Sequence, residues 1–372
     1  MKLAIVHDWL VNYMGAEKCV ESFTNIWDDA DILSLVDFLN DDERRIILKG
    51  KHAETSFVQK MPMAKRLYRN YFPFFPYAIE QLDVSGYDVV LSSSHAFAKG
   101  VLTSANQLHI CYCHTPIRYG WDLYHQYIKE ANLTKGIKGL LAKRYLHNIR
   151  MWDFSTSNRV DHFIANSQHV AKRINKLYRK EAAVIHPPVD VDKFTPNKTK
   201  DDYYLAVARF VPYKKMDLLV EAFSRMPDKK LIVIGSGPDE AKIKAKAKSN
   251  ITVLPFQTDE KLVEYMRSAK AFLFAAEEDF GITIVEAQAC GTPVIAYGLG
   301  GATETVVENK TGLFFDKQEN NAIADAIERF ENSIELFDPT KIAEHAQKFS
   351  RVRYEKEIKE FVEAKLNDFK EK

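Results

Sequence analysis

Residues 278–296 read EDFGITIVEAQACGTPVIA, which is a loop, a helix and a strand in succession. Gly281 permits backbone angles that other residues avoid, and the apolar residues after it have the spacing of a buried helix. The Gly-Thr-Pro that follows ends this helix, and the last apolar residues predict a short buried strand. Two carboxylates stand eight positions apart, Glu278 in the loop before the helix and Glu286 inside the helix.

These two carboxylates have two interpretations. A carboxylate inside an otherwise apolar helix costs free energy unless it is hydrogen-bonded, and the hydroxyl groups of a bound ligand are suitable donors. Alternatively, Glu278 only interacts favourably with the helix dipole and Glu286 pairs with a lysine of the core. Other motifs along the chain bear on this choice.

Length and composition are those of a globular protein with two domains. The chain has 372 residues, of which 46% are hydrophobic and 28% charged, and its net charge is +1. A near-neutral chain gives no sign of nucleic-acid binding. The charge is unevenly distributed, because residues 49–180 hold 20 lysines and arginines against 8 acids, and residues 1–47 hold 4 against 10.

The four cysteines are Cys19, Cys111, Cys113 and Cys290, and their spacing fits no zinc site. We expect reduced core thiols in a cytoplasmic protein. The N-terminal MKLAIVHDW reads as a buried strand, because it lacks the long apolar stretch and the cleavage site of a signal peptide. No apolar run reaches the roughly 18 residues that a membrane span needs.

Short apolar runs alternate with helical patterns, which predicts an α/β fold with two doubly wound, Rossmann-like domains. The expected strands are 3–6, 32–35, 89–91, 108–112, 162–165 and 183–185, followed by 204–207, 230–234, 251–254, 271–274, 294–296 and 312–315. Prolines in 187–200 predict a hinge, so we expect domains at 1–190 and 200–350 and a ligand cleft between them. Residues 351–372 form a charged amphipathic helix, predicted to pack back on the first domain.

Charged and glycine-rich turns follow two strands of the second half. Arg209 and Lys214 come after the strand 204–207 and before a helix, an arrangement that suits a diphosphate, although ordinary surface charges look the same. Gly235 belongs to a Gly-Ser-Gly-Pro turn whose backbone can approach a ligand, but any tight turn has this form. The chain has neither GxGxxG after its first strand nor the P-loop pattern GxxxxGK[ST].

Two residues of the first half also follow predicted strands. Gly15 lies at the start of a helix after the strand 3–6, which is in principle an anion site. His114 follows the strand 108–112 and is expected to project into the cleft, with a purely structural histidine as the alternative.

Together, the Arg with a Lys five residues later, the glycine turn and E-x7-E around Phe-Gly resemble glycosyltransferase family 4, retaining and metal-independent enzymes of the GT-B fold. The resemblance covers nearly the whole chain. The motifs HDWLxxxxGAE and CHTPIRYGWD are similar to a bacterial subgroup that includes O-antigen mannosyltransferases and other surface-polysaccharide transferases. Two departures are Met14 and Lys215, where family members usually carry glycine, and Met14 is expected to narrow or shift the phosphate loop.

The resemblance implies a role for each predicted residue. Arg209 and Lys214 would bind the donor diphosphate and stabilise the departing nucleotide. Glu286 would bind the ribose hydroxyls, Glu278 hydroxyls of the donor sugar, and His114 the same sugar near the reacting carbon. The predicted catalytic residues are thus His114, Arg209, Lys214 and Glu278, and the other donor-binding residues are Gly15, Gly235, Phe280, Gly281, Ile282 and Glu286.

The resemblance further implies transfer of a sugar to an acceptor hydroxyl, without metal or cofactor. GDP-mannose is the expected donor and a lipid-linked glycan of surface polysaccharide or O-antigen synthesis the expected acceptor. UDP- or dTDP-sugar donors remain open, as does a sugar-nucleotide epimerase of the same fold. Pyridoxal-dependent phosphorylases share the fold but are usually far longer, and the intact carboxylates and cations argue against a non-catalytic binding module.

Two basic segments contain aromatic and aliphatic residues, residues 60–75 and residues 135–152. Such segments suit docking on anionic lipid, which predicts peripheral contact with the inner face of the cytoplasmic membrane. The alternative is that both segments pack on their own domain.

Overall fold

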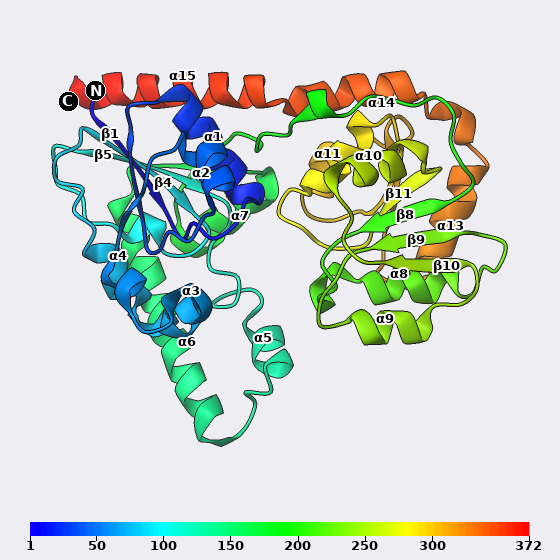
Figure 1. Cartoon of the computed structure of the whole chain (residues 1–372), viewed down its shortest axis with the longest axis horizontal. Helices are drawn as coiled ribbons and strands as arrows, with labels where there is room; N and C mark the ends of the chain where they lie inside the picture. The colour runs from blue at the N-terminus through cyan, green and yellow to red at the C-terminus, as the bar shows by residue number, and fades with distance from the viewer. Residues whose placement is uncertain (372) are drawn as a thin grey trace. The chain divides into compact units, whose positions relative to one another are not determined.

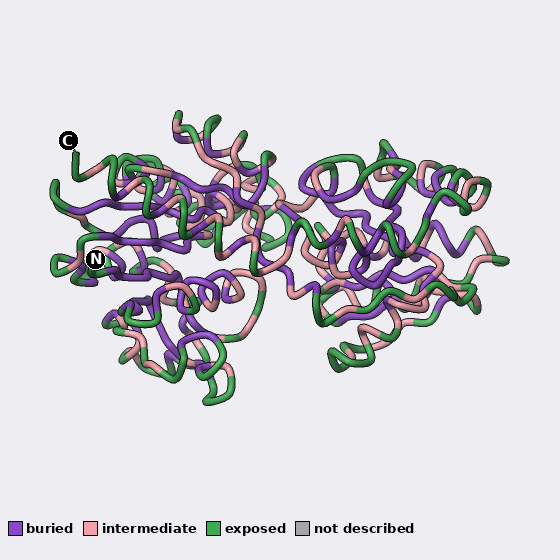
Figure 2. Tube along the Cα trace, turned by 90° about the horizontal axis from the view of Figure 1, so that it is seen from above, coloured by how far each residue is buried: buried purple, intermediate pink, exposed green. Residues whose placement is uncertain are grey.

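The computed structural model describes residues 1–371 and contains two compact units, Met1–Pro188 with Tyr354–Lys372 and Val189–Arg353. Each unit has a parallel sheet with helices on its faces (Figure 1), and the strands form the buried centre (Figure 2). The predicted α/β class with two Rossmann-like domains is therefore confirmed.

The first unit has a seven-stranded sheet in the order β3-β2-β1-β4-β5-β6-β7. These strands are β1 (Leu3–His7), β2 (Asp31–Ser34), β3 (Glu54–Thr55), β4 (Val89–Ser94), β5 (Leu108–Cys113), β6 (His162–Ala165) and β7 (Ala182–Val184). Its helices are α1 (Gly15–Ile26), α2 (Asp41–Leu48), α3 (Ala64–Leu67), α4 (Phe75–Glu80), α5 (Tyr124–Glu130), α6 (Gly136–Thr156) and α7 (Gln168–Tyr178). Every residue of β1, β4 and β5 is buried, as expected for central strands covered on both faces.

The second unit has a six-stranded sheet in the order β10-β9-β8-β11-β12-β13. These strands are β8 (Tyr204–Val207), β9 (Leu231–Ile234), β10 (Ile251–Leu254), β11 (Ala271–Phe274), β12 (Val294–Tyr297) and β13 (Gly312–Phe315). Its helices are α8 (Met216–Phe223), α9 (Glu240–Lys246), α10 (Asp259–Ser268), α11 (Ile282–Ala289), α12 (Ala302–Thr305), α13 (Asn320–Glu331) and α14 (Pro339–Ala346).

Each sheet has one point where the strand order reverses, between β1 and β4 in the first and between β8 and β11 in the second. In open parallel sheets, ligands bind outside the carboxyl ends of the strands at such a point, because the loops on either side diverge there. The loops after β1, β4, β8 and β11 are therefore where functional residues are expected.

The C-terminal helix α15 (Arg351–Lys370) starts in the second unit and continues into the first. One side of it enters the core of the first unit through Tyr354, Ile358, Val362 and Leu366. The apolar stripe that the sequence predicts is thus buried as a helix face should be.

All twelve predicted strands are present with small shifts at their ends, and the short edge strand β3 was missed. The chain passes from the first unit to the second after Pro188, near the start of the hinge predicted over 187–200. Val189, Val191 and Phe194 pack with α11 residues of the second unit, since these side chains are apolar enough to be buried there. The units accordingly divide at Pro188 and, on the return of the chain, at Arg353.

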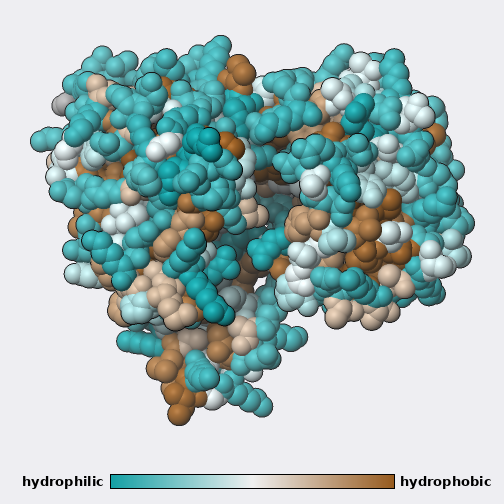
Figure 3. All heavy atoms as spheres, in the orientation of Figure 1, coloured by the Kyte–Doolittle hydropathy of each residue, from teal (hydrophilic) through white to brown (hydrophobic). Residues whose placement is uncertain are grey.

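Helix α6 differs between its two ends. Near its C-terminal end Ile149 is buried, but Ile137, Leu140 and Leu141 near its start are 79%, 68% and 63% exposed. Figure 3, in the orientation of Figure 1, shows hydrophobic side chains gathered at this end of the helix. We call residues 135–144 the α6 tip. Because these apolar side chains are exposed, packing on the domain accounts for only part of the basic segment 135–152.

Basic side chains border the α6 tip. Lys135, Lys138 and Arg144 are exposed. In the other basic segment, 60–75, Phe75 is buried in the core of the first unit, whereas the cations Lys65, Arg66 and Arg69 are exposed. Among residues 1–371, no helix is both long and apolar enough to cross a membrane.

Candidate functional site

The loop between β11 and α11 fixes the position of Glu278 in the second unit. Gly281 precedes α11 with a left-handed φ of 87°, and a Cβ on it would lie 2.9 Å from Ile284. The loop after β12 holds Glu278 from the other side. The Gly301 amide donates to the Glu278 carbonyl at 2.8 Å, and a Cβ on Gly300 would lie 2.5 Å from that oxygen. Glycines in both loops therefore define the backbone path at Glu278.

Two cations follow β8, on the other side of the reversal point. Lys214 ends the 3-10 helix Pro212–Lys214, and its Nζ lies 2.6 Å from Oε1 of Glu278. The two side chains are 20% and 18% exposed, so a ligand can reach the pair. The side chain of Arg209 is exposed and makes no hydrogen bond or ion pair with any residue that the structure describes. The loop after β8 thus carries one paired cation, Lys214, and one unpaired cation, Arg209.

Glu286 is less enclosed than the sequence suggested. It lies on α11 and is partly exposed, whereas the buried residues of that helix are Ile284, Val285, Ala287, Gln288 and Ala289. The expected burial of this carboxylate inside an apolar helix is therefore wrong. The fully buried polar side chain is Gln288, whose Nε2 donates to the Thr305 carbonyl at 3.0 Å and to Oγ1 of Thr311 at 3.1 Å.

Two of the predicted donor-binding residues, Gly235 and Phe280, are constrained by packing. A Cβ on Gly235 would lie 1.9 Å from the Ala208 carbonyl oxygen, so the turn after β9 needs glycine whether or not a ligand binds. Phe280 is buried with its ring centroid 5.6 Å from that of Phe349, which leaves its backbone as the part that can contact a ligand. Ile282 begins α11 and is partly exposed.

In the first unit, a buried aspartate organises the loop after β4. Asp8 follows β1 and is fully buried, and its carboxylate accepts hydrogen bonds from the four backbone amides of residues 95–98. Nδ1 of His95 lies 3.0 Å from Oδ2 of Asp8. The sequence did not lead us to predict either residue as part of the site. The signal that could have indicated Asp8 is the polar pair His7-Asp8 at the end of a buried strand.

The ionisation of this pair follows from its contacts. Burial acts to raise the pKa of Asp8, but the charge and hydrogen bond of His95 outweigh it and hold that pKa well below its usual range. Burial acts to lower the pKa of His95, and Asp8 outweighs it in turn, so the pKa of His95 is raised. Both groups therefore favour their charged forms.

His114 follows β5 and contacts β4 of the same unit. Its amide donates to the Ser94 carbonyl at 2.9 Å, and its Nε2 lies 2.9 Å from Oγ of Ser93. Burial, followed by the nearby His95 and His7, lowers the pKa of His114 well below its usual value. The ring is therefore neutral at pH 7.

Gly15 begins α1, the helix that follows β1. The residue before it, Met14, has an extended φ of −130° and a side chain that is 49% exposed. Its amide donates to Oε2 of Glu17 at 3.1 Å. This φ does not require glycine, so Met14 is accommodated without backbone strain.

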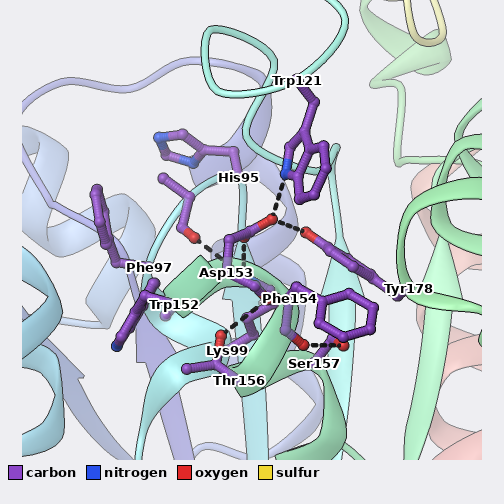
Figure 4. A network of polar contacts seen from close by, with 12 residues as sticks. His95, Phe97, Lys99, Trp121, Trp152, Asp153, Phe154, Thr156, Ser157 and Tyr178 are labelled. Atoms are coloured by element: carbon purple, nitrogen blue, oxygen red, sulfur yellow. Dashed lines mark hydrogen bonds and ion pairs between the residues drawn. The ribbon is translucent and has the colours of Figure 1, made fainter. Parts of the chain in front are cut away.

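Figure 4 shows the polar network that anchors the loop after His114. Asp153 of α6 is fully buried and accepts hydrogen bonds from Lys99, from Nε1 of Trp121 at 2.7 Å and from the Tyr178 hydroxyl at 2.8 Å. Trp121 belongs to the loop, and Asp153 and Tyr178 belong to α6 and α7. Loss of one partner would leave a buried charge uncompensated, so the network is costly to disturb.

The predicted residues therefore form two groups. Gly15 and His114 lie in the first unit, and all the others lie in the second, where β8, β9, β11 and α11 carry them. Within residues 1–371, no group of three or more histidine, cysteine, aspartate or glutamate side chains could hold a metal ion.

Comparison with known proteins gives matches over most of the chain. Residues 38–193 match the family described as Glycosyltransferase Family 4, and residues 190–364 match the family described as Glycosyl transferases group 1. The D-inositol 3-phosphate glycosyltransferase of Mycobacteroides abscessus is 31% identical over 240 residues, which are 56% of this chain and 53% of that protein. The chain thus matches about half the length of this curated relative.

Solved structures share the fold. HepE of Anabaena in complex with UDP aligns with a TM-score of 0.71 at 18% identity, covering 98% of this chain and 100% of that one. Sucrose-phosphate synthase of Thermosynechococcus elongatus aligns with a TM-score of 0.72 at 16% identity, covering 99% and 100%.

Proposed function

Because the chain belongs to glycosyltransferase family 4 and has the GT-B fold, we propose that it transfers a hexose from a nucleoside diphosphate sugar to an acceptor hydroxyl with retention of configuration. The observation that carries this proposal is that two cations, Arg209 and Lys214, follow β8 and that Lys214 lies 2.6 Å from the carboxylate of Glu278. Fixed cations stabilise a diphosphate more as it gains negative charge on leaving, which lowers the barrier.

The contacts of Lys214 support a role on the phosphate. Its ammonium group has three N–H donors, and the ion pair with Glu278 occupies one direction, which leaves donors for phosphate oxygens. Glu278 and Glu286 bind hydroxyl groups of the sugar and the ribose in this proposal. The acceptor attacks on the face that the diphosphate leaves, and the departing phosphate takes the acceptor's proton. Because two cations carry the phosphate charge, we expect full activity in EDTA.

The proposed donor is GDP-mannose, and the proposed acceptor is a lipid-linked glycan in surface-polysaccharide or O-antigen synthesis. The resemblance of the HDWL and CHTPIRYGWD motifs to O-antigen mannosyltransferases supports this choice. UDP-glucose is the second candidate, since HepE of similar fold has been crystallised with it.

A thermal-shift comparison tests the donor directly. A ligand at 100 times its Kd stabilises the folded state by about 2.7 kcal/mol, so the correct nucleotide sugar should raise Tm clearly above the others. GDP-mannose, UDP-glucose and a dTDP-sugar are compared at equal concentration, with Lys214→Ala as the variant expected to lose the shift. No shift with any nucleotide sugar would contradict the proposal.

The outcome with sugar nucleotide alone separates a transferase from an epimerase. A transferase leaves the sugar nucleotide intact until an acceptor is added, apart from slow hydrolysis. Appearance of an epimeric sugar nucleotide without acceptor would favour the epimerase instead.

We further propose that the α6 tip docks on an anionic bilayer at the inner face of the cytoplasmic membrane. Exposed Ile137, Leu140 and Leu141 beside exposed lysines suit insertion among anionic headgroups. Segment 60–75 would add its cations and the exposed Phe74, whereas Tyr68 and Phe75 are packed inward.

Sedimentation with phosphatidylglycerol-containing and pure phosphatidylcholine vesicles tests this docking. We expect salt-sensitive binding to the anionic vesicles alone, and loss of binding in the triple variant Ile137→Asn, Leu140→Asn, Leu141→Asn. Val352→Asn is the matched control, because Val352 is 72% exposed on α15. Equal binding by the triple variant and the wild type would remove the α6 tip from the proposal.

A further inference from the structure

Three side chains from adjacent strands form a continuous hydrogen-bonded row in the first unit. His7 and Ser93 are partners in the register of β1 and β4, and both are fully buried. Nδ1 of His7 lies 3.2 Å from the Ser93 carbonyl oxygen and 3.1 Å from Ser93 Oγ. Oγ of Ser93 lies 2.9 Å from Nε2 of His114.

Counting donors and acceptors fixes the direction of these bonds. The Ser93 carbonyl can only accept, so its 3.2 Å contact points to a proton on Nδ1 of His7, whose other nitrogen, Nε2, lies 3.7 Å from Oε1 of Glu17. Ser93 Oγ therefore cannot donate to His7, and its remaining partner is Nε2 of His114. A fully buried hydroxyl needs an acceptor for its proton, so Ser93 donates and Nε2 of His114 accepts.

The proton of the neutral His114 ring then resides on Nδ1. This atom makes no hydrogen bond with any residue in 1–371, and it is not one of the buried unpartnered atoms of the structure. Burial, His95 and His7 keep the pKa of His114 low, so the ring is uncharged at neutral pH. His114 thus has one nitrogen held by β4 and one N–H left over.

We infer that Ser93 and His7 are positioning residues that hold His114 in the Nδ1–H tautomer, so that it offers a neutral N–H donor to an oxygen of the bound sugar. The inference rests on the proposed transfer reaction for the identity of that oxygen. A neutral donor has a physical advantage over an imidazolium there. Positive charge grows on the anomeric carbon in an oxocarbenium-like transition state, and a cation nearby would oppose it.

The tautomer can be measured in the resting protein without any activity. Long-range ¹H–¹⁵N spectra of ¹⁵N-histidine-labelled protein distinguish a protonated ring nitrogen from an unprotonated one. With 11 histidines in the chain, the His114 signals are assigned by their absence in His114→Gln. We expect protonated Nδ1 in the wild type and a mixture of tautomers in Ser93→Ala. Protonated Nε2 in the wild type would overturn the inference.

Ser92→Ala is the matched control. Ser92 is also fully buried, and its Oγ lies 2.9 Å from Nε2 of the buried His109, but successive residues of β4 point to opposite faces of the sheet. Each serine variant deletes one buried hydroxyl, which contacts His109 in the case of Ser92 and both His7 and His114 in the case of Ser93. Only Ser93→Ala should change the tautomer of His114, and an equal change in Ser92→Ala would indicate a general disturbance of β4 and contradict the inference.

Kinetics then test the link to the reaction. We expect kcat to fall on the order of 10- to 100-fold in Ser93→Ala, because the donor is misplaced, with little change in the donor KM. His7→Asn retains an N–H near the position of Nδ1 and should keep more activity than His7→Phe. An unchanged kcat in Ser93→Ala would contradict the inference. If the wild type itself transfers no sugar, the proposed function fails while the tautomer measurement still stands.

Discussion

The carboxyl edges of the two sheets carry functional groups at equivalent topological positions, but they are built differently. In the first unit, Asp8 and Ser93 are fully buried and hydrogen-bonded to residues of the loops that follow the adjacent strands β4 and β5. In the second, Lys214 and Glu278 are each about one-fifth exposed, and Arg209 is exposed. A buried network fixes geometry in advance and is costly to disturb, whereas exposed charges can exchange partners when a ligand arrives. Loss of the buried charge of Asp8 should therefore act mainly on folding, and variants of the second edge mainly on turnover.

The largest effect is expected at Asp8. Asp8→Asn replaces one accepting oxygen with an NH₂ group that faces backbone N–H donors, and it removes the partner of His95. Breaking a buried charged contact of this kind costs about 3–5 kcal/mol. Urea unfolding followed by tryptophan fluorescence measures it, because all four tryptophans, Trp9, Trp27, Trp121 and Trp152, lie in the first unit.

Asp83→Asn is the control for this measurement. Asp83 also accepts a backbone N–H, that of Ser85 at 2.9 Å, but it is exposed to solvent. Its substitution should shift the unfolding midpoint far less. Equal destabilisation by the two variants would contradict the view that burial makes the first edge sensitive.

Acid should weaken the first unit next. Burial lowers the pKa of His109 to about 4 in the folded state, below its ordinary value of 6.5. Between these two values the unfolded chain binds a proton that the folded chain does not, so stability falls as pH falls from 6.5 to 4. The loss amounts to about 3 kcal/mol at pH 4. His114 acts in the same direction.

Tryptophan-monitored unfolding across this pH range checks the prediction. His109→Gln removes the titrating group and should flatten the profile. Asp8 does not offset this loss of stability. Its pKa is lowered in the folded state, so its own contribution to stability is constant above the ordinary pKa of an aspartate and is lost only at lower pH. If the free energy of unfolding of the wild type does not change between pH 6.5 and 4, the predicted acid destabilisation is wrong.

The regular part of the fold was predictable because it depends on local pattern. Runs such as Ala271–Phe274 and Tyr204–Val207 are apolar at every position, which is typical of a strand covered on both faces. The edge strand β3 has two residues and no apolar pattern, so nothing marks it in the sequence. The packing of Val189 and Phe194 on the second unit was missed, because the prolines before them resemble a linker.

The residues of the candidate site likewise divide into those that local sequence predicts and those that it does not. Arg209, Lys214 and Glu278 could be found from their positions after predicted strands, since charge at the end of a buried strand is conspicuous. Asp8 and Ser93 could not be assigned roles, because their partners are 87 and 21 residues away along the chain. Strand order alone brings these groups together, and local sequence does not specify it.

The second edge should respond in turnover rather than stability. Lys214→Ala is expected to lower kcat about 100-fold, or about 2.7 kcal/mol in the barrier, because it removes a cation from the departing diphosphate. Lys215→Gly is the matched control, since it removes the adjacent charge in the same turn. Steady-state kinetics with the donor found by thermal shift measures both. Near-wild-type kcat in Lys214→Ala, or an equal loss in Lys215→Gly, would contradict the assignment.

The smallest effect concerns the backbone of that turn. Lys215 has a φ of 56°, a left-handed conformation that is unfavourable for lysine and easy for glycine. Lys215→Gly should therefore stabilise the start of α8 by about 0.5–1 kcal/mol. Hydrogen-exchange mass spectrometry reads this locally, as exchange slowed about two- to fivefold in peptides over 216–223. Asn309→Gly changes another left-handed residue of the same unit, with φ 59°, and should gain less because asparagine tolerates this conformation. Faster exchange in Lys215→Gly would instead mean that the lysine side chain stabilises the turn, and that this edge is more firmly built than its exposure indicates.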